Sequence, residues 1–142
     1  MHPDCQPDDP SISDSEPLLR RIHPDNVNPQ SGMVVPDAFD DFECSVEIKS
    51  KSSPQRCLAY LFSRQVNFAN LNDTKRYEKF FKKGWRVASI FAQIPRALNQ
   101  TVYPDVEKVQ FKDIEITNDA HALICGQKDD EVLYELAKNA VV

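Results

Sequence analysis

The sequence has only three glycines among its 142 residues, and they stand apart at positions 32, 84 and 126. A glycine-rich phosphate-binding loop is therefore excluded, and with it most familiar nucleotide-binding enzymes. The chain also lacks an uncharged apolar run of the roughly 18 residues that a transmembrane helix needs. Its first residues have neither the basic region nor the apolar core of a secretory signal. We therefore expect a cytoplasmic protein that does not interact with a membrane.

Cysteine and histidine are scarce as well. The four cysteines, at positions 5, 44, 57 and 125, form no CxxC pair. In a chain without an export signal, free thiols are the favoured interpretation, and a scaffold of two disulfides is the less favoured one. The three histidines, His2, His23 and His121, form no HxxxH, HxE or Cys/His zinc pattern. We accordingly expect no metal and no cofactor.

The charge is unevenly distributed. Through residue 41 there are nine acids and two bases, whereas thirteen acids and fifteen bases follow. Residues 1–17 contain five acids, four prolines and no base. Such a segment buries too little apolar surface to offset the entropy lost on ordering. The composition predicts a disordered acidic, proline-rich leader over residues 1–17 and a single domain over residues 18–142.

Strand and helix patterns are mixed along the domain. Apolar and polar residues alternate, or β-branched and aromatic residues concentrate, in several short segments typical of strands. Longer segments with N-cap residues and helical spacing indicate helices. The expected strands cover residues 44–49, 85–92, 102–103, 114–116 and 120–125, and the expected helices cover residues 54–64, residues 72 or 73 to 84, and a last segment from residue 129 or 130. This order predicts a small α+β domain in which one mostly antiparallel sheet packs against two or three helices.

One predicted helix is strongly basic, with six bases and two acids in residues 73–86. At 100° per residue its lysines form one stripe, while the spacing of its aromatic residues places them in the core. The stripe could contact nucleic-acid phosphates or an acidic protein surface, or it could be an ordinary solvated face. The acidic leader could also lie over the stripe and compete with an external partner. The candidate partner-binding residues are Lys75, Arg76, Lys79, Lys82, Lys83 and Arg86.

Two polar clusters are candidates for catalysis. Arg20, Arg21 and His23 lie within four residues, and His121 stands between two alanines two residues after Asp119. A guanidinium group can hold a phosphate or carboxylate, and an imidazole can transfer a proton near neutral pH. The structural alternative is that these arginines pair with nearby carboxylates and that His121 forms a hydrogen bond at the start of a strand.

The same clusters carry a resemblance. Residues 18–24 (LLRRIHP), followed by residues 37–39 (DAF) and 44–46 (CSV), resemble the opening of a group of small bacterial proteins of unassigned function, with Asp37 where serine is expected. Residues 118–126 (NDAHALICG) are similar to the closing signature of that group, with Asp119 in place of the usual proline. The resemblance transfers no activity, but it implies that Arg21, His23 and His121 meet in space.

These observations lead to two functional hypotheses. The first is a small, non-catalytic accessory protein that binds a protein or a nucleic acid through the basic helix of residues 73–86. The alternative is a hydrolase or a phosphate- or nucleotide-handling enzyme, in which Arg20 or Arg21 holds an anionic group and His23 or His121 moves the proton. A purely structural subunit would require a large apolar patch around Phe91 and Ile94.

Overall fold

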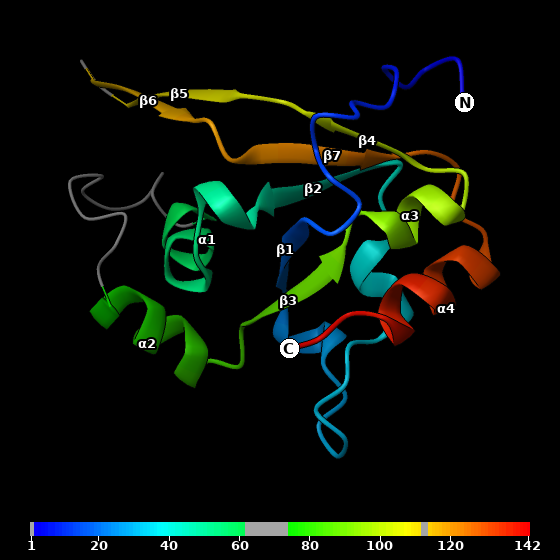
Figure 1. Cartoon of the computed structure of the whole chain (residues 1–142). Coiled ribbons are helices and arrows are strands. Elements are labelled where there is room, and N and C mark those ends of the chain that lie inside the picture. Colours follow the sequence, from blue (N-terminus) through cyan, green and yellow to red (C-terminus); the bar gives the residue numbers. More distant parts are fainter. Residues whose placement is uncertain (1, 62–73, 112–113) are drawn as a thin grey trace.

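The computed structural model describes residues 2–61, 74–111 and 114–142, and its centre is an antiparallel sheet (Figure 1). Five strands follow the order β3-β1-β2-β7-β4, and β5 and β6 form a separate hairpin. The strands are β1 (Pro17–Ile22), β2 (Glu43–Ile48), β3 (Arg86–Phe91), β4 (Thr101–Pro104), β5 (Glu107–Phe111), β6 (Ile114–Asn118) and β7 (His121–Cys125). The α-helices of the described residues are α1 (Pro54–Leu61), α2 (Thr74–Lys82), α3 (Gln93–Ala97) and α4 (Asp130–Lys138). This architecture confirms the predicted α+β class.

One face of the sheet carries the main hydrophobic core. Leu18 lies opposite both Ile48 and Ile90, so that neighbouring strands bring apolar side chains to the same face. Phe39, from the short 3-10 helix η2 (Pro36–Phe39), and Leu136 of α4 are fully buried in this cluster. Helix α4 begins where the sequence predicts it, because the Asp129 side chain accepts a hydrogen bond from the Val132 N–H.

The opposite face is covered in two parts. Helix α1 packs over β1 and buries Cys57 and Leu58. The N-terminal leader crosses the sheet in front of β7 and β2 before it enters β1 (Figure 1), and its Cys5 packs against Tyr103, Leu123 and Cys125. The predicted extension of α1 to residue 64 lies outside the described residues.

The leader differs from the prediction of a disordered segment. Cys5 forms a disulfide with Cys125, so the expectation of free thiols is wrong for this pair, while Cys44 and Cys57 are free and buried. Asp8 and Asp14 both pair with Arg96 of α3, at 3.0 and 2.9 Å. A covalent bond and a shared guanidinium group therefore hold a segment whose composition alone would leave it mobile. The leader's ion pairs among the described residues are with Arg96 of α3 and, within the leader, between His2 and Asp4, and none of them is with a described base of the basic helix.

Both edges of the sheet are capped by the chain termini. On the β4 edge, the Asp9 N–H donates to the Val102 carbonyl at 2.9 Å and the Val102 N–H donates to Asp8 Oδ1 at 2.8 Å. On the β3 edge, Ser89 and Val141 exchange two backbone hydrogen bonds. An uncovered edge strand can pair with another chain, and these contacts oppose that pairing.

No helix of the described ranges is long and apolar enough to cross a membrane.

Candidate functional site

The basic helix predicted from the sequence is α2, and its end is well defined. The Gly84 N–H donates to the Phe81 carbonyl and the Trp85 N–H donates to the Phe80 carbonyl, which is the hydrogen-bond pattern of a Schellman cap. Gly84 has φ +97°, a conformation that favours glycine, and its Cα faces the Pro24 ring closely. This contact brings the segment after β1 next to the turn between α2 and β3.

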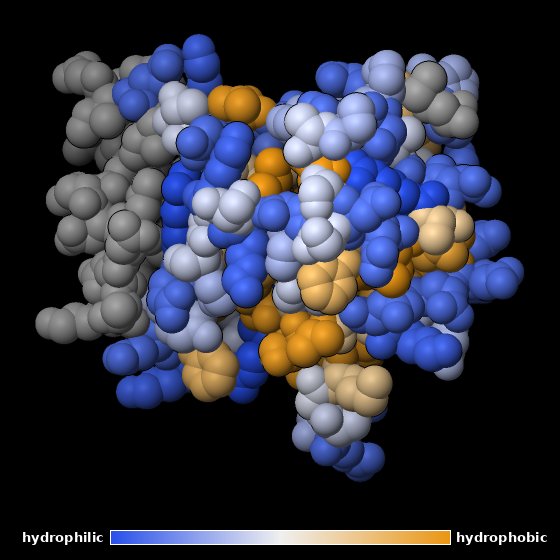
Figure 2. Space-filling model, viewed as in Figure 1, coloured by the Kyte–Doolittle hydropathy of each residue, from blue (hydrophilic) through white to orange (hydrophobic). Residues whose placement is uncertain are grey.

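Three lysines at the end of α2 and directly after it extend into solvent. Lys79, Lys82 and Lys83 are exposed, and none of them pairs with a carboxylate among the described residues. Lys75 and Arg76 belong to the same helix, but their side chains lie outside the described set. Hydrophilic side chains predominate over α2 in the lower left of Figure 2. We call Lys79, Lys82, Lys83 and Arg86 the basic surface.

The other arginines with described side chains, unlike these lysines, pair with carboxylates of the protein itself. Each of them contacts a carboxylate within 3.3 Å, and each of these contacts ties two distant segments together. The pairs are Arg20 with Asp41, Arg21 with Glu47, Arg56 with Asp119, and Arg96 with Asp8 and Asp14. Their charge is largely compensated within the protein, whereas Lys79, Lys82 and Lys83 have no such partner among the described residues.

Aromatic side chains border the basic surface. Phe81 is 43% exposed, so the expectation that all three aromatics of α2 lie in the core is wrong for this residue. The Arg86 guanidinium lies over its ring, with Cζ 3.7 Å from the centroid. The same guanidinium donates through Nη1 to the carbonyls of Phe81 and Trp85 at 2.9 and 2.8 Å, which fixes its position. A cation held on an aromatic face is a preorganised contact for an anionic or planar group.

His23 belongs to this region as well. Its ring lies 4.9 Å from the Trp85 ring in an edge-to-face arrangement, and its Nδ1 accepts the Asp25 N–H. Strand β1 ends at Ile22, and the chain then turns through the 3-10 helix η1 (Pro24–Asn26), which directs His23 toward α2. No pattern in the sequence indicates that Phe81 is exposed. The position of His23 next to Trp85 is not predicted by the sequence pattern either, because it depends on the turn at Pro24.

Arg21 faces a buried polar cluster on the α1 side of the sheet. The Glu47 side chain is 1% exposed, and its carboxylate accepts hydrogen bonds from Arg21 Nη1 at 3.3 Å and from Ser52 Oγ at 2.6 Å. Arg21 Nη1 also donates to the Cys57 carbonyl at 3.2 Å. Burial raises the pKa of the Cys57 thiol far above its usual range, and the neighbouring Glu47 carboxylate adds to the effect. The thiol is therefore kept in its unreactive, protonated form.

His121 lies opposite Glu47 in the pairing of β2 with β7, so the two side chains point to the same face of the sheet. The His121 Nδ1 atom is 2.6 Å from the Asp105 carbonyl, and Nε2 is 2.7 Å from Glu107 Oε1. The Nε2 contact lacks hydrogen-bond geometry and is an ion pair only when the ring is protonated. The ring is only 5% exposed and joins the β4–β5 connection to the start of β7.

The structure thus brings together only part of the predicted Arg/His cluster. Arg21 and His121 both flank Glu47, whereas His23 contacts Trp85 near the basic helix. Two cavities of the described chain, about 170 and 410 Å³ in volume, are lined by other residues. Among the described residues no group of three His, Cys, Asp or Glu side chains could hold a metal ion.

Comparisons with known proteins add no assignment. Neither a known protein family, nor a curated protein, nor a solved structure matches the chain significantly. The resemblance to small bacterial proteins therefore stays a prediction that depends on the segments 18–24 and 118–126.

Proposed function

We propose that the protein is a non-catalytic accessory protein that binds an anionic macromolecular partner, a protein or a nucleic acid, through the basic surface of α2. One observation carries this proposal: Lys79 and Lys82 of α2, and Lys83 directly after it, are exposed without a carboxylate partner among the described residues. Glu78 is the single acid within Thr74–Lys82. Association with an anionic partner would therefore gain from charge attraction without first breaking an internal ion pair.

The geometry of α2 supports a specific contact in addition to general attraction. Lys79 and Lys82 are three residues apart, which is nearly one turn and roughly 4.5 Å along the helix axis, and Lys83 follows directly after the helix. Arg86 extends the positive charge beyond the end of the helix and is held in place by Phe81 and two backbone carbonyls. The exposed part of the Phe81 ring gives the partner an apolar or stacking contact next to these charges.

The alternative enzymatic function has less support. Arg21 and His121 have partners within the protein, and His23 lies in another part of the molecule. A substrate would have to displace Glu47 from Arg21 or reach a His121 ring that is only 5% exposed. Among the predicted catalytic residues only His23 is well exposed, at 51%, and it lies apart from Arg21 and His121, so the alternative stays a prediction.

The cytoplasmic location is part of the proposal, and so is the bacterial source implied by the resemblance. Disulfides are rare in reducing compartments, so the Cys5–Cys125 bond makes the location testable. Alkylation of thiols in intact cells, followed by mass spectrometry, measures the fraction of Cys5 that is oxidised. A cytoplasmic protein should contain mostly reduced Cys5, and full oxidation would place the protein in an oxidising compartment.

The binding proposal is tested by affinity purification of the tagged full-length protein with and without nuclease treatment. Loss of the co-purified material after nuclease treatment identifies a nucleic-acid partner, and retention identifies a protein. The variant Lys79→Glu/Lys82→Glu/Lys83→Glu should lose the partner in both arms, because it reverses the charge of the helix.

A matched control keeps this experiment specific. The variant Lys49→Glu/Lys51→Glu/Lys138→Glu changes three exposed lysines elsewhere and produces the same net charge. It should retain the partner. Equal retention by both variants would overturn the proposal, and equal loss would show that overall charge, and not the α2 surface, governs binding.

A further inference from the structure

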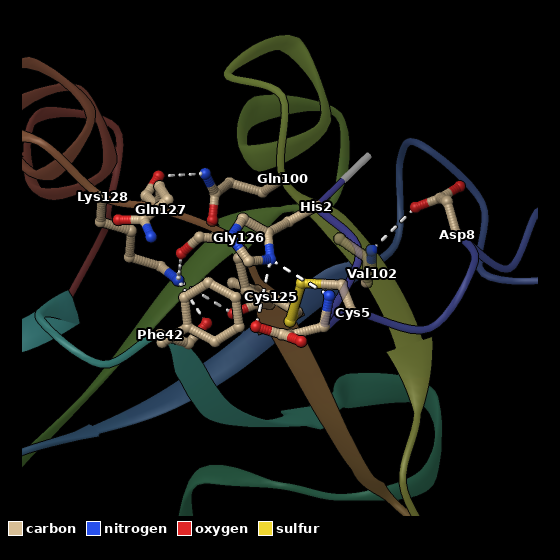
Figure 3. The surroundings of a disulfide bond; sticks show 12 residues. His2, Cys5, Asp8, Phe42, Gln100, Val102, Cys125, Gly126, Gln127 and Lys128 are labelled. Atoms are coloured by element: carbon tan, nitrogen blue, oxygen red, sulfur yellow. Dashed lines mark hydrogen bonds and ion pairs between the residues drawn. A yellow bond between two sulfur atoms is a disulfide. The ribbon is translucent and has the colours of Figure 1, made fainter.

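The leader is attached to the domain in two different ways (Figure 3). Its first part, residues 2–7, depends mainly on the Cys5–Cys125 disulfide. The described residues of this part make few other contacts with the domain: Cys5 packs against Tyr103 and Leu123, His2 forms an edge-to-face contact with Phe42, at 4.8 Å between ring centroids, and the Tyr103 hydroxyl forms a hydrogen bond with the Gln6 backbone. The side chains between these contacts are mostly polar or proline and point into solvent.

The second part, residues 8–16, is held without any contribution from sulfur. Asp8 Oδ1 accepts hydrogen bonds from Arg96 Nε and the Val102 N–H, and Arg96 Nη2 donates to the Asp9 carbonyl at 2.8 Å. Ile12 is 5% exposed and belongs to the main core. These contacts anchor the leader from Asp8 onward, whatever the state of the disulfide.

The two sulfur atoms also differ in their access to solvent. Cys5 is 7% exposed and stands between the exposed residues Asp4 and Gln6, whereas Cys125 is 1% exposed within β7. A thiolate in solution therefore reaches the sulfur of Cys5 first. Cys44 and Cys57 are fully enclosed, and burial raises the pKa of both thiols, so neither is suited to attack the bond from inside.

We propose that the Cys5–Cys125 disulfide is a redox-controlled attachment of the leader to the sheet. A dithiol reductant releases residues 2–7 from the sheet, while residues 8–16 stay docked. One thiolate of the dithiol attacks Cys5 Sγ, a mixed disulfide forms, and Cys125 leaves as a thiolate that takes up a proton. The second thiolate of the same reductant then attacks the reductant sulfur of the mixed disulfide. Cys5 leaves as a thiolate and takes up the second proton. Two electrons and two protons pass to the protein, and the reductant becomes a disulfide.

Release has a defined structural consequence. Without the bond, the few remaining contacts of residues 2–7 do not offset the entropy of ordering them. Their departure uncovers Tyr103, Leu123 and Cys125 on the sheet face, next to Phe42. It also removes His2 from the wall of the 410 Å³ cavity. Reduction thus converts a covered apolar face into an exposed one without unfolding the domain.

The four cysteines provide the test. The full chain is treated with iodoacetamide under native conditions, with and without prior reduction by dithiothreitol, and labelling at each cysteine is followed by mass spectrometry. After reduction, Cys5 and Cys125 should react at least tenfold faster than Cys44 and Cys57. Without reduction, all four should stay unlabelled.

The variant Cys5→Ser is the matched control, because it removes the bond without a reductant. Its Cys125 should react without dithiothreitol at the rate seen in the reduced wild type, and hydrogen exchange at the Val102 N–H should stay slow because Asp8 still binds it. Slow labelling of Cys125 after reduction would overturn the proposal, because the leader would then stay in place. Labelling of all four cysteines in parallel would overturn it too, because reduction would then unfold the domain, and labelling of Cys5 and Cys125 without reduction would show that the bond is absent.

Discussion

The Cys5→Ser change should lower the free energy of unfolding by several kcal/mol while leaving the native fold intact. The disulfide closes a loop with a sequence separation of 120 residues. In the chain-entropy description, a loop of this length stabilises the folded state by about 5 kcal/mol at 25 °C, because it restricts the unfolded chain. A domain of ordinary stability, about 5–15 kcal/mol, would lose a third of that value or more.

Urea unfolding followed by circular dichroism measures this loss. With a slope of about 2 kcal/mol per molar urea, the midpoint of Cys5→Ser should lie roughly 2.5 M below that of the oxidised wild type. Reduced wild type should unfold at the midpoint of the variant, and dithiothreitol should not affect the variant further. If oxidised wild type and Cys5→Ser unfold within 0.5 M of each other (about 1 kcal/mol at this slope), the leader is not covalently held and the reasoning fails.

Three further predictions concern single residues. Burial lowers the pKa of Lys128 to about 8 while its Nζ donates to three backbone carbonyls, so the unfolded state binds more protons between pH 8 and 10.5. The free energy of unfolding of wild type minus that of Lys128→Met should therefore rise across this range, by about 1–2 kcal/mol because Lys128 is only partly buried and solvent screens its charge, and a flat difference in urea titrations would contradict the assignment. Gly126→Ala should destabilise by roughly 2 kcal/mol, since a Cβ would lie 2.7 Å from Gln100 Oε1, and an unchanged thermal midpoint would exclude this clash. Glu47→Gln should cost about 3 kcal/mol because it removes the buried carboxylate that pairs with the partly buried Arg21 guanidinium, and a loss below about 1 kcal/mol in urea unfolding would show that this ion pair does not stabilise the fold.

The strand and helix patterns were sufficient to predict the fold class because each reports a single buried face. In β2 the alternating Cys44, Val46 and Ile48 are buried in the core, as the pattern predicts. The pattern failed for Glu47, which it places toward solvent, because α1 and the polar residues Arg21 and Ser52 cover the second face of the sheet. Whether a second face is covered depends on how distant elements pack, and local periodicity contains no such information.

The leader and the candidate site show the same limit. Composition describes the cost of ordering residues 1–17, but not the bond from Cys5 to a cysteine far along the chain or the Arg96 side chain that meets two of its acids. The charge of α2 could be read from the sequence because helical spacing groups nearby residues. The approach of His23 to Trp85 could not, because the turn at the end of β1 decides it.

Chromatography on heparin, a polyanion, tests directly whether the basic surface of α2 is an anion-binding site. Wild type, Lys79→Glu/Lys82→Glu/Lys83→Glu and the equally charged Lys49→Glu/Lys51→Glu/Lys138→Glu are eluted with a salt gradient, since salt weakens such contacts in proportion to their number. Wild type and the second variant should be retained and elute at similar salt concentrations, and the first variant should pass through. If the two variants elute together, the positive charge of α2 is an ordinary solvated face and the proposed function is wrong.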